Sequence, residues 1–246
     1  MCSYGDFAYF YDLLMKDVDY NKKCDFILSL FEKWGKKPTL LLDLACGTGE
    51  FSNLMSEKGI EVIGVDMSED MLSVARQKTA ERGNDILYLC QRAEQLDLYG
   101  TVDGAICCLD SLNHITNKRA FAKAIERTAL FLEKDSLFIF DLNTPYKHKE
   151  ILANNTFVIE EDDLYLVWQN SFNEKKLTTQ ISLDFFTRQN DLYGRYSECF
   201  EERAYKQEEI AQILQKSGFQ ILAVYDGETK KSPSKKTERW IYVVKK

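Results

Sequence analysis

The 246-residue sequence contains only 3 Pro and 2 His, and it has no surplus of basic residues. Lys and Arg total 32 against 39 Asp and Glu, which gives a formal net charge of −7 at pH 7. This deficit argues against a nucleic-acid partner, because broad contact with a phosphate backbone needs clustered Lys and Arg. No apolar run could span a bilayer, and residues 1–6 lack the basic and apolar regions of a signal peptide. We therefore expect no membrane partner.

The cysteines also exclude some classes of site. All 7 stand outside C-x-x-C pairs and outside zinc-like spacings, so we expect no metal centre. Cys90 and the pair Cys107-Cys108 fall in apolar runs, where cysteine acts as a small buried hydrophobe. Such usage fits a reducing compartment, and we predict a cytoplasmic protein. The sequence leaves open whether it is a monomer or a homodimer.

The most informative segment is a glycine turn between an apolar run and a helix-like stretch. Leu40–Leu44 lead into Ala45-Cys46-Gly47-Thr48-Gly49, and a helical pattern follows. Glycine lets backbone N–H groups approach a ligand without an intervening Cβ. A second apolar run, residues 62–66, ends in Asp66, which lies 19 residues after Gly47. That separation is close to the ~20 residues expected of an acid that binds ribose hydroxyls, so an adenosine-containing ligand is predicted.

The glycine spacing differs from that of two common nucleotide-binding loops. Ser52 stands at the third glycine position of G-x-G-x-x-G, and no G-K-[ST] sequence follows. Both departures count against a dinucleotide fingerprint and a P-loop. Residues 43–49 instead resemble motif I of the class I S-adenosylmethionine-dependent methyltransferases. An ordinary turn beside a surface Asp is the alternative interpretation.

Strands and helices alternate over the first 144 residues, which favours an α/β fold with a parallel sheet covered on both faces. Strands are expected at 40–44, 62–66, 86–90, 105–109 and 137–140, the last ending at Asp141. Helical patterns run over 19–34, about 51–59, 68–83 and 117–133. The resemblance implies a doubly wound, mostly parallel, seven-stranded sheet of the Rossmann-like methyltransferase type.

After Pro145 the pattern changes to period-two alternation. Antiparallel strands are expected at 164–172, 177–187 and 192–205, with a fourth near 156–160. A helix at 207–217 and strands at 219–225 and 239–244 complete the sequence. We interpret the block as an antiparallel β insertion after strand five. Residues 1–150 and 206–246 would form the S-adenosylmethionine-binding domain, and residues 151–205 a lid or substrate subdomain.

The resemblance implies cofactor contacts beyond the carboxyl ends of the strands, where open parallel sheets bind ligands. Asp66 matches the acid that holds both ribose hydroxyls, and Met67 would pack on the adenine. Arg92 stands where family members often carry an acid. Because a guanidinium only donates hydrogen bonds, the backbone N–H of Ala93 is the expected adenine contact. The other expected cofactor-binding residues are Tyr11, Asp43, Ala45, Cys46, Gly47, Thr48, Gly49, Glu94, Cys108, Leu109 and Asp110.

Three residues are candidates for a catalytic role. His114 could act as a general base, since its reference pKa is near neutrality, or it could satisfy a buried carbonyl. Asn113 has the same two interpretations. Tyr205 is the third candidate, and together with Arg203 it is expected in the acceptor pocket at the end of the insertion. His148, in a polar stretch, is expected to be solvated.

The N-terminus is rich in aromatic residues. Tyr4, Phe7, Tyr9, Phe10 and Tyr11 resemble the Y-x-x-F-A-x-x-Y-D-x-L-M opening of small-molecule methyltransferases, whose leading segment folds over the cofactor. Aromatic faces suit a sulfonium, because a desolvated cation over a ring gains ~0.5–2 kcal/mol. A hydrophobic anchor packed on the sheet is the alternative.

The resemblance implies a methyltransferase that uses S-adenosyl-L-methionine to methylate N or O of a small-molecule acceptor. No N-P-P-Y motif follows strand five, and neither Cys107 nor Cys108 follows a proline, which disfavours the base-directed DNA enzymes. Three alternatives stay open. They are an RNA-modifying methyltransferase, a non-catalytic S-adenosylmethionine-binding module and, less favoured, a nicotinamide-dependent oxidoreductase.

Overall fold

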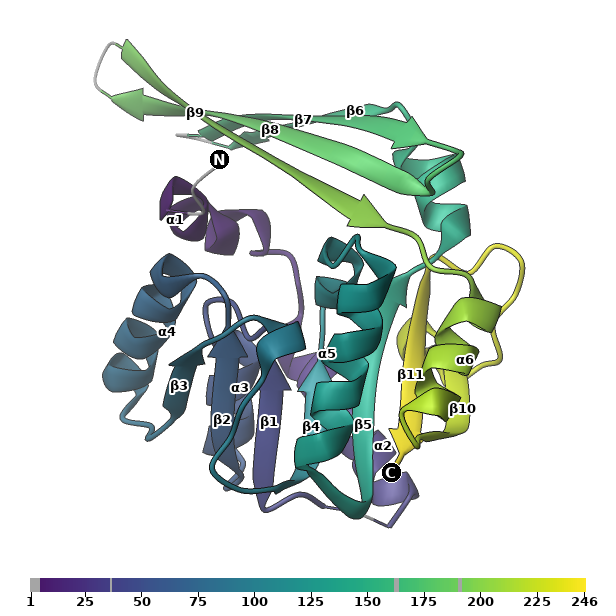
Figure 1. The fold of residues 1–246 in the computed structure, drawn as a ribbon. Coiled ribbons are helices and arrows are strands. Elements are labelled where there is room, and N and C mark those ends of the chain that lie inside the picture. Colours follow the sequence, from purple (N-terminus) through teal and green to yellow (C-terminus); the bar gives the residue numbers. More distant parts are fainter. Residues whose placement is uncertain (1–4, 36, 162–163, 190–191) are drawn as a thin grey trace.

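A computed structural model describes residues 5–35, 37–161, 164–189 and 192–246. Its central element is a seven-stranded sheet in the order β10-β11-β5-β4-β1-β2-β3 (Figure 1). The strands are β1 (Leu40–Leu44), β2 (Glu61–Asp66), β3 (Leu87–Cys90), β4 (Val102–Cys107), β5 (Leu132–Asn143), β10 (Gln220–Asp226) and β11 (Arg239–Lys245). The first five run parallel, and β11 is antiparallel to both of its neighbours. The predicted mostly parallel, doubly wound sheet is confirmed.

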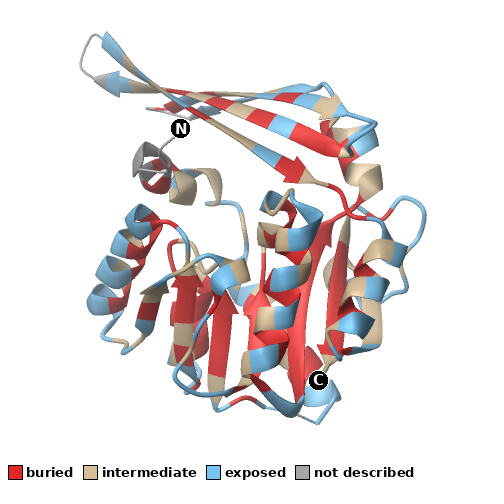
Figure 2. Cartoon of the chain, viewed as in Figure 1, coloured by how far each residue is buried: buried red, intermediate tan, exposed pale blue. Residues whose placement is uncertain are grey.

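Helices cover both faces of this sheet. Buried residues of α2 (Tyr20–Lys33) and α3 (Glu50–Glu57) form one core layer. Those of α5 (Lys118–Phe131) and α6 (Gln207–Lys216) form the other. Most of the central strands are therefore buried on both sides (Figure 2), as expected where crossover helices flank parallel strands. The carboxyl ends of the strands are the part of the sheet left for a ligand.

The fourth helix, α4 (Glu69–Arg82), begins and ends as its sequence predicts. Ser68 is the N-cap, and its side chain accepts a hydrogen bond of 3.3 Å from the N–H of Met71. Gly83 ends the helix in the left-handed conformation with φ 69°. This helix therefore starts three residues after Asp66, so the tip of β2 stays next to a fixed turn.

Strand β5 is longer than the predicted 137–140, extending from Leu132 to Asn143. The extension follows from strand pairing, because Arg239 of β11 lies opposite Asn143 and Val102 of β4 lies opposite Leu132. The longer strand carries Asp141 and Asn143 to the carboxyl edge of the sheet.

A second sheet lies across that edge (Figure 1). It consists of four antiparallel strands, β6 (Thr156–Glu161), β7 (Leu164–Asn173), β8 (Thr178–Gln189) and β9 (Leu192–Arg203), in sequence order. The predicted antiparallel insertion after strand five is confirmed. The π-helix η3 (Lys147–Leu152) leads into it, and β9 returns the chain to α6. Short 3₁₀ turns complete the fold, namely η1 (Ala93–Gln95), η2 (Ser111–His114) and η4 (Gly227–Thr229).

The N-terminal helix α1 (Gly5–Leu14) packs between α4 and the second sheet (Figure 1). The ring of Phe10 stacks on Phe185 with centroids 4.8 Å apart, and Met71 of α4 belongs to the same apolar cluster. No helix in the described part of the chain is both long and apolar enough to cross a membrane.

Candidate active site

A cavity of about 540 Å³ lies between the strand tips of the large sheet and the inner face of the second sheet. Its size is in the range of ~300–1,000 Å³ that small-molecule sites occupy. Fourteen of the fifteen expected cofactor-binding residues line it, and Gly49 is the exception. Nearly all of the residues predicted to bind the cofactor therefore surround one cavity, and their contact with a cofactor stays a prediction.

The glycine loop after β1 has two glycines with different surroundings. A Cβ on Gly47 would meet nothing within 4 Å, so the peptide here is open toward the cavity. A Cβ on Gly49 would lie 2.5 Å from the hydroxyl of Tyr88 and 2.9 Å from Cβ of Ala75. Gly49 instead caps α3 with φ 75°, a conformation in which only glycine is unstrained. The expectation of a cofactor contact at Gly49 is therefore wrong, and its role is close packing against Tyr88.

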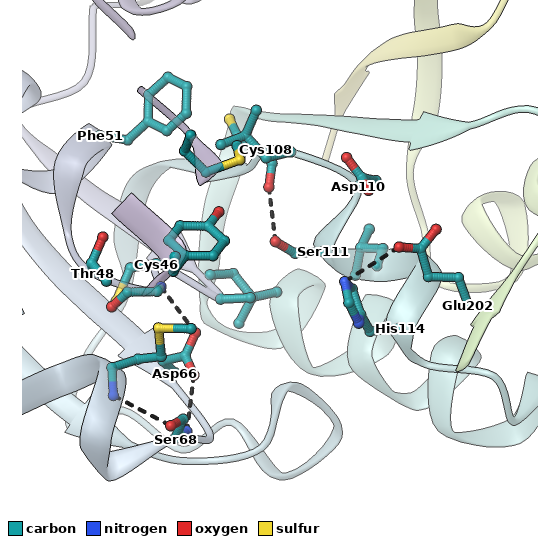
Figure 3. A pocket seen from close by; sticks show the side chains of 18 of the residues that line it. Cys46, Thr48, Phe51, Asp66, Ser68, Cys108, Asp110, Ser111, His114 and Glu202 are labelled. Carbon is teal, nitrogen blue, oxygen red and sulfur yellow. Dashed lines mark hydrogen bonds and ion pairs between the residues drawn. The ribbon is translucent and has the colours of Figure 1, made fainter. Parts of the chain in front are cut away.

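Asp66 ends β2 with its carboxylate turned toward the glycine loop (Figure 3). Its Oδ2 accepts a 2.9 Å hydrogen bond from the N–H of Gly47, and its Oδ1 accepts one of 2.9 Å from the N–H of Ser68. Burial raises the pKa of Asp66, and these backbone donors oppose that shift. A carboxylate has about four acceptor positions, so two remain for further donors. The residues present thus fit a ribose diol.

Asp43 lies behind the loop on β1. It is 2% exposed, and its Oδ2 accepts a 2.6 Å hydrogen bond from the hydroxyl of Ser52. Burial raises the pKa of Asp43 to about 7, although the Ser52 hydrogen bond opposes the shift. Ser52, which stands where a dinucleotide fingerprint has its third glycine, thus braces a cavity-lining carboxyl group.

The N-terminal segment borders the cavity and packs against the second sheet. The hydroxyl of Thr48 donates to Asp12 at 2.8 Å, and Lys78 forms an ion pair of 2.7 Å with the other oxygen of Asp12. Tyr11 lines the cavity, while Phe10 packs under the second sheet. Phe10 therefore anchors the segment, and the contact of Tyr11 with the cofactor stays a prediction. Of the other aromatics named for it, Tyr4 and the side chains of Phe7 and Tyr9 lie outside the described residues.

Arg92 lines the cavity but is already paired. Its Nε donates to Oε1 of Glu94 at 2.6 Å. Ala93 lies between the two on the same turn and also faces the cavity. The turn after β3 therefore places Ala93 and the carboxylate of Glu94 at the cavity, and their contact with an adenine stays a prediction.

The turn after β4 holds two residues in an uncommon backbone conformation. Leu109 and Asp110 have φ of 59° and 53°. Their N–H groups donate to the carboxylate of Asp141 at 2.9 and 2.6 Å. Arg239 of β11 then donates to both Asp110 and Asp141 at 2.6 Å. Non-glycine residues in this region cost about 1–3 kcal/mol each, and such strain concentrates at functional sites.

Sequence reasoning missed two charged residues of the cavity. Glu202 and Lys147 both line it, and Glu202 is 4% exposed. Side chains alternate along a strand, so Phe200 and Glu202 of β9 face the cavity while Arg203 points elsewhere. The expectation that Arg203 lines the acceptor pocket is therefore wrong by one position. Alternation along β9 places Glu202 and Arg203 on opposite faces, but the sequence carries no signal for which face is covered.

Comparison with known proteins supplies the family. A protein-family model described as a methyltransferase domain matches residues 41–134. A Bacillus subtilis protein named "Putative methyltransferase YqeM" is 32% identical over 244 residues. The match covers 99% of this chain and 97% of the relative. The crystal structure of an S-adenosylmethionine-dependent methyltransferase from Clostridium acetobutylicum is 35% identical, with a TM-score of 0.90 and 98% of each chain covered. This chain belongs to the S-adenosylmethionine-dependent methyltransferases. S-adenosylmethionine is therefore its cofactor.

A third similarity is confined to part of the chain. A ubiquinone biosynthesis O-methyltransferase from Idiomarina loihiensis is 39% identical over 92 residues, which is 37% of this chain and 37% of that protein.

The three catalytic candidates of this methyltransferase have different surroundings. His114 lines the cavity, with 35% of its side chain exposed. Asn113 is fully buried and lies outside the lining; its amide donates to the carbonyls of Asn143 and Arg203 at 3.1 and 2.8 Å. These bonds tie η2 to both sheets. The catalytic interpretation of Asn113 is therefore wrong, because its polar atoms are used in structural hydrogen bonds.

Tyr205 also lies outside the cavity of this methyltransferase. Its ring is 1% exposed and stacks on Phe121 with centroids 4.1 Å apart. Its hydroxyl donates to the carbonyl of Ile115. The expectation of a catalytic Tyr205 is wrong, because the residue follows β9 after the chain has turned into the core beneath α5.

The expectation that His148 is solvated is wrong. The residue is 0% exposed rather than solvated, and its Nδ1 shares a 2.8 Å hydrogen bond with the hydroxyl of Thr179. Burial lowers the pKa of His148 to about 4, so the ring is neutral at pH 7. The π-helix η3 turns this side chain beneath the second sheet instead of toward solvent.

We predict that Tyr205→Phe leaves kcat and the Kd for S-adenosylmethionine unchanged within about twofold. The substitution removes one hydrogen bond, which contributes about 1 kcal/mol, and keeps the stacked ring. Urea unfolding measures the lost stability, and initial rates measure kcat. A tenfold fall in kcat with an unchanged Kd would restore Tyr205 as a catalytic residue.

Proposed function

We propose that this enzyme transfers the methyl group of S-adenosylmethionine to a nitrogen or oxygen atom of a small molecule. The observation that carries the proposal is the continuity of the cavity. It extends from the glycine loop and Asp66 to a chamber roofed by Trp168, Ile181 and Leu183 of the second sheet. A roof of this kind encloses a metabolite and excludes water, and it leaves little room for a folded macromolecule.

In the cofactor half of the cavity, each strand tip would bind a different part of S-adenosylmethionine. The open peptide at Gly47 would lie against the amino-acid portion, Asp66 would bind the ribose hydroxyls, and the turn with Ala93 would bind the adenine. S-adenosylmethionine supplies an activated methyl group on a sulfonium, so the protein needs no covalent nucleophile. The protein's own contribution is to hold the two reactants in line, which can supply up to ~7–11 kcal/mol of the barrier.

Two observations favour a small acceptor over RNA. The net charge is −7, and Arg239, a cation at the cavity, is already paired with two carboxylates. The relative from Idiomarina loihiensis, which is similar over 92 residues, is named for the biosynthesis of a small molecule, ubiquinone.

His114 is the group proposed to accept a proton. Burial lowers its pKa, with the negative charge of Asp110 acting in the opposite direction. A lowered pKa keeps the imidazole neutral at pH 7, and only the neutral ring can accept a proton. His114 also touches the roof through Phe200, whose ring centroid lies 5.0 Å away.

We predict that His114→Ala lowers kcat by about 10²- to 10⁴-fold, the usual contribution of a positioned acid or base. The Kd for S-adenosylmethionine should change less than about threefold, because the side chain belongs to the acceptor half of the cavity. In the wild type, kcat should fall on the acid side, below the lowered pKa of His114. Steady-state rates between pH 5 and 9 measure this limb. Equal kcat in both proteins at all pH values would remove the proton-accepting role.

The function itself is tested by incubating the protein with S-adenosylmethionine and fractionated metabolite extracts. S-adenosylhomocysteine should form only in fractions that contain an acceptor, and mass spectrometry should find a product that has gained one methyl group. Binding of S-adenosylmethionine without turnover in any fraction would favour a binding module. Methylation of added tRNA alone would favour an RNA-modifying enzyme.

A further inference from the structure

Three side chains with acceptor atoms converge in the half of the cavity away from the glycine loop (Figure 3). Asp110 follows β4, His114 ends η2, and Glu202 comes from β9. One ligand atom of each lies within 4.8 Å of the others. Nε2 of His114 and Oε1 of Glu202 are 3.7 Å apart. The second sheet therefore completes a polar pocket that the large sheet alone would leave open.

Glu202 gives an independent indication that a ligand belongs here. It lines the cavity and is 4% exposed, yet its Oε2 accepts no hydrogen bond from the described part of the chain. Buried polar atoms are almost always hydrogen-bonded, so an unpartnered carboxylate oxygen calls for an explanation. Nε2 of His148, which also lacks a hydrogen bond within the described part of the chain, lies 3.7 Å from that oxygen. A ligand that brings N–H donors would satisfy the glutamate.

The surrounding charges decide which kind of donor fits. Arg239 lies 2.6 Å from Asp110, and Lys147 enters the cavity with its Nζ 3.0 Å from the side-chain oxygen of Asn143. A divalent cation would be repelled by both basic groups. An alcohol brings one O–H donor and cannot serve three acceptors. An ammonium carries a single charge and three N–H donors, which matches the three converging acceptor groups.

We infer that the acceptor is a primary amine on an apolar body, and that Glu202 receives the amine's proton by way of His114. The inference rests on the proposed function. The apolar body would pack against Ile159, Trp168, Ile181, Leu183 and Phe200, which line the same half of the cavity.

The chemistry balances with groups already present. The bound ammonium gives one proton to neutral His114, which passes it to Glu202. The freed nitrogen lone pair then forms a bond to the methyl carbon while the carbon–sulfur bond breaks and its electron pair stays on sulfur. The products are the methylated ammonium and S-adenosylhomocysteine, and one proton leaves to solvent. The separation of 3.7 Å between His114 and Glu202 is within the range that shortens when an active site closes on its ligand.

The electrostatic surroundings of Glu202 agree with this role. Burial and the negative charge of Asp110 raise the pKa of Glu202, and Lys147 and Arg239 oppose the shift. The other groups that face it are His114 and His148, whose pKa values are both lowered by burial. Burial and the charge of Asp110 therefore make Glu202 a better proton acceptor than an ordinary carboxyl group.

The test uses matched amines and alcohols, with tryptamine against tryptophol and phenethylamine against 2-phenylethanol. Isothermal titration calorimetry at pH 8 measures their binding to the protein saturated with S-adenosylhomocysteine. Each amine should bind at least about tenfold more tightly than its alcohol. Glu202→Gln should abolish this preference, and it should also move the pH profile of the amine's binding. Glu198→Gln is the matched control, since Glu198 is buried on the same strand but lies outside the cavity lining.

Equal affinities for amine and alcohol, a preference for alcohols, no amine binding, or a preference that survives in Glu202→Gln would each overturn the inference. Binding of Mg²⁺, Mn²⁺ or Zn²⁺ that Glu202→Gln abolishes, without an amine preference, would replace it with a metal site. Failure of the wild type to bind S-adenosylhomocysteine would count against the proposed function instead. The two failures are therefore distinguishable.

Discussion

Asp66→Ala is expected to raise the Kd for S-adenosylmethionine about 100-fold. A hydrogen bond to a charged group contributes about 1.5–3 kcal/mol, and 1.4 kcal/mol corresponds to a factor of ten in Kd. The carboxylate lies at the tip of β2 and has acceptor positions left after binding the N–H groups of Gly47 and Ser68. Isothermal titration calorimetry with the two proteins measures the difference directly.

The same substitution should also lower stability, because Asp66 fixes the glycine loop from below. Its removal leaves two backbone N–H groups without their acceptor, so thermal unfolding of the ligand-free protein should occur several degrees lower. Asp103→Ala is the matched control. The carboxylate of Asp103 accepts hydrogen bonds from the N–H groups of Thr39 and Leu40 at 2.9 and 2.8 Å, at the opposite end of β1. That variant should lose stability without losing affinity, and an equal loss of affinity in both would mean that Asp66 acts only through loop structure.

Gly49→Ala is expected to destabilise the protein by about 3 kcal/mol or more. A left-handed conformation costs a non-glycine residue about 1–2 kcal/mol, and overpacking a tight contact costs about 1–3 kcal/mol. The added methyl group would lie 2.5 Å from the hydroxyl of Tyr88 and 2.9 Å from Cβ of Ala75. Urea unfolding followed by circular dichroism measures the change.

Gly47→Ala separates the cost of backbone strain from the cost of overpacking. Its φ is 55° but a Cβ would meet nothing within 4 Å, so only the backbone strain of about 1–2 kcal/mol applies. The added methyl group stands at the cavity, however, and cofactor affinity should fall more than in proportion to stability. If Gly47→Ala proved the more destabilising of the two, the assignment of Gly49 as the packing glycine would be wrong.

The cofactor half was predictable because one short segment encodes it. Leu40–Leu44, the glycine turn and Asp66 follow one another closely in the chain, and parallel pairing of β1 with β2 necessarily brings them together. Local spacing was therefore sufficient. The turn after β3 was also placed correctly, since the carboxyl ends of neighbouring parallel strands share one edge of the sheet.

The acceptor half was not predictable in the same way. Glu202 and Arg203 are adjacent on β9, and without knowing which face of the strand is covered, alternation cannot tell which one enters the cavity. Arg239 reaches the turn after β4 only because β11 runs antiparallel beside β5. His148 is buried because it lies in a π-helix, and no pattern in the sequence predicted that helix. These residues depend on contacts between segments far apart in the chain.

A structure of the protein crystallised with S-adenosylhomocysteine tests the central claim most directly. Both ribose hydroxyls should lie about 2.6–3.2 Å from the carboxylate oxygens of Asp66, with the amino-acid portion along the open peptide at Gly47. The sulfur should face the chamber beneath Trp168 and Phe200. A nucleoside bound elsewhere, or ribose hydroxyls out of reach of Asp66, would contradict the account.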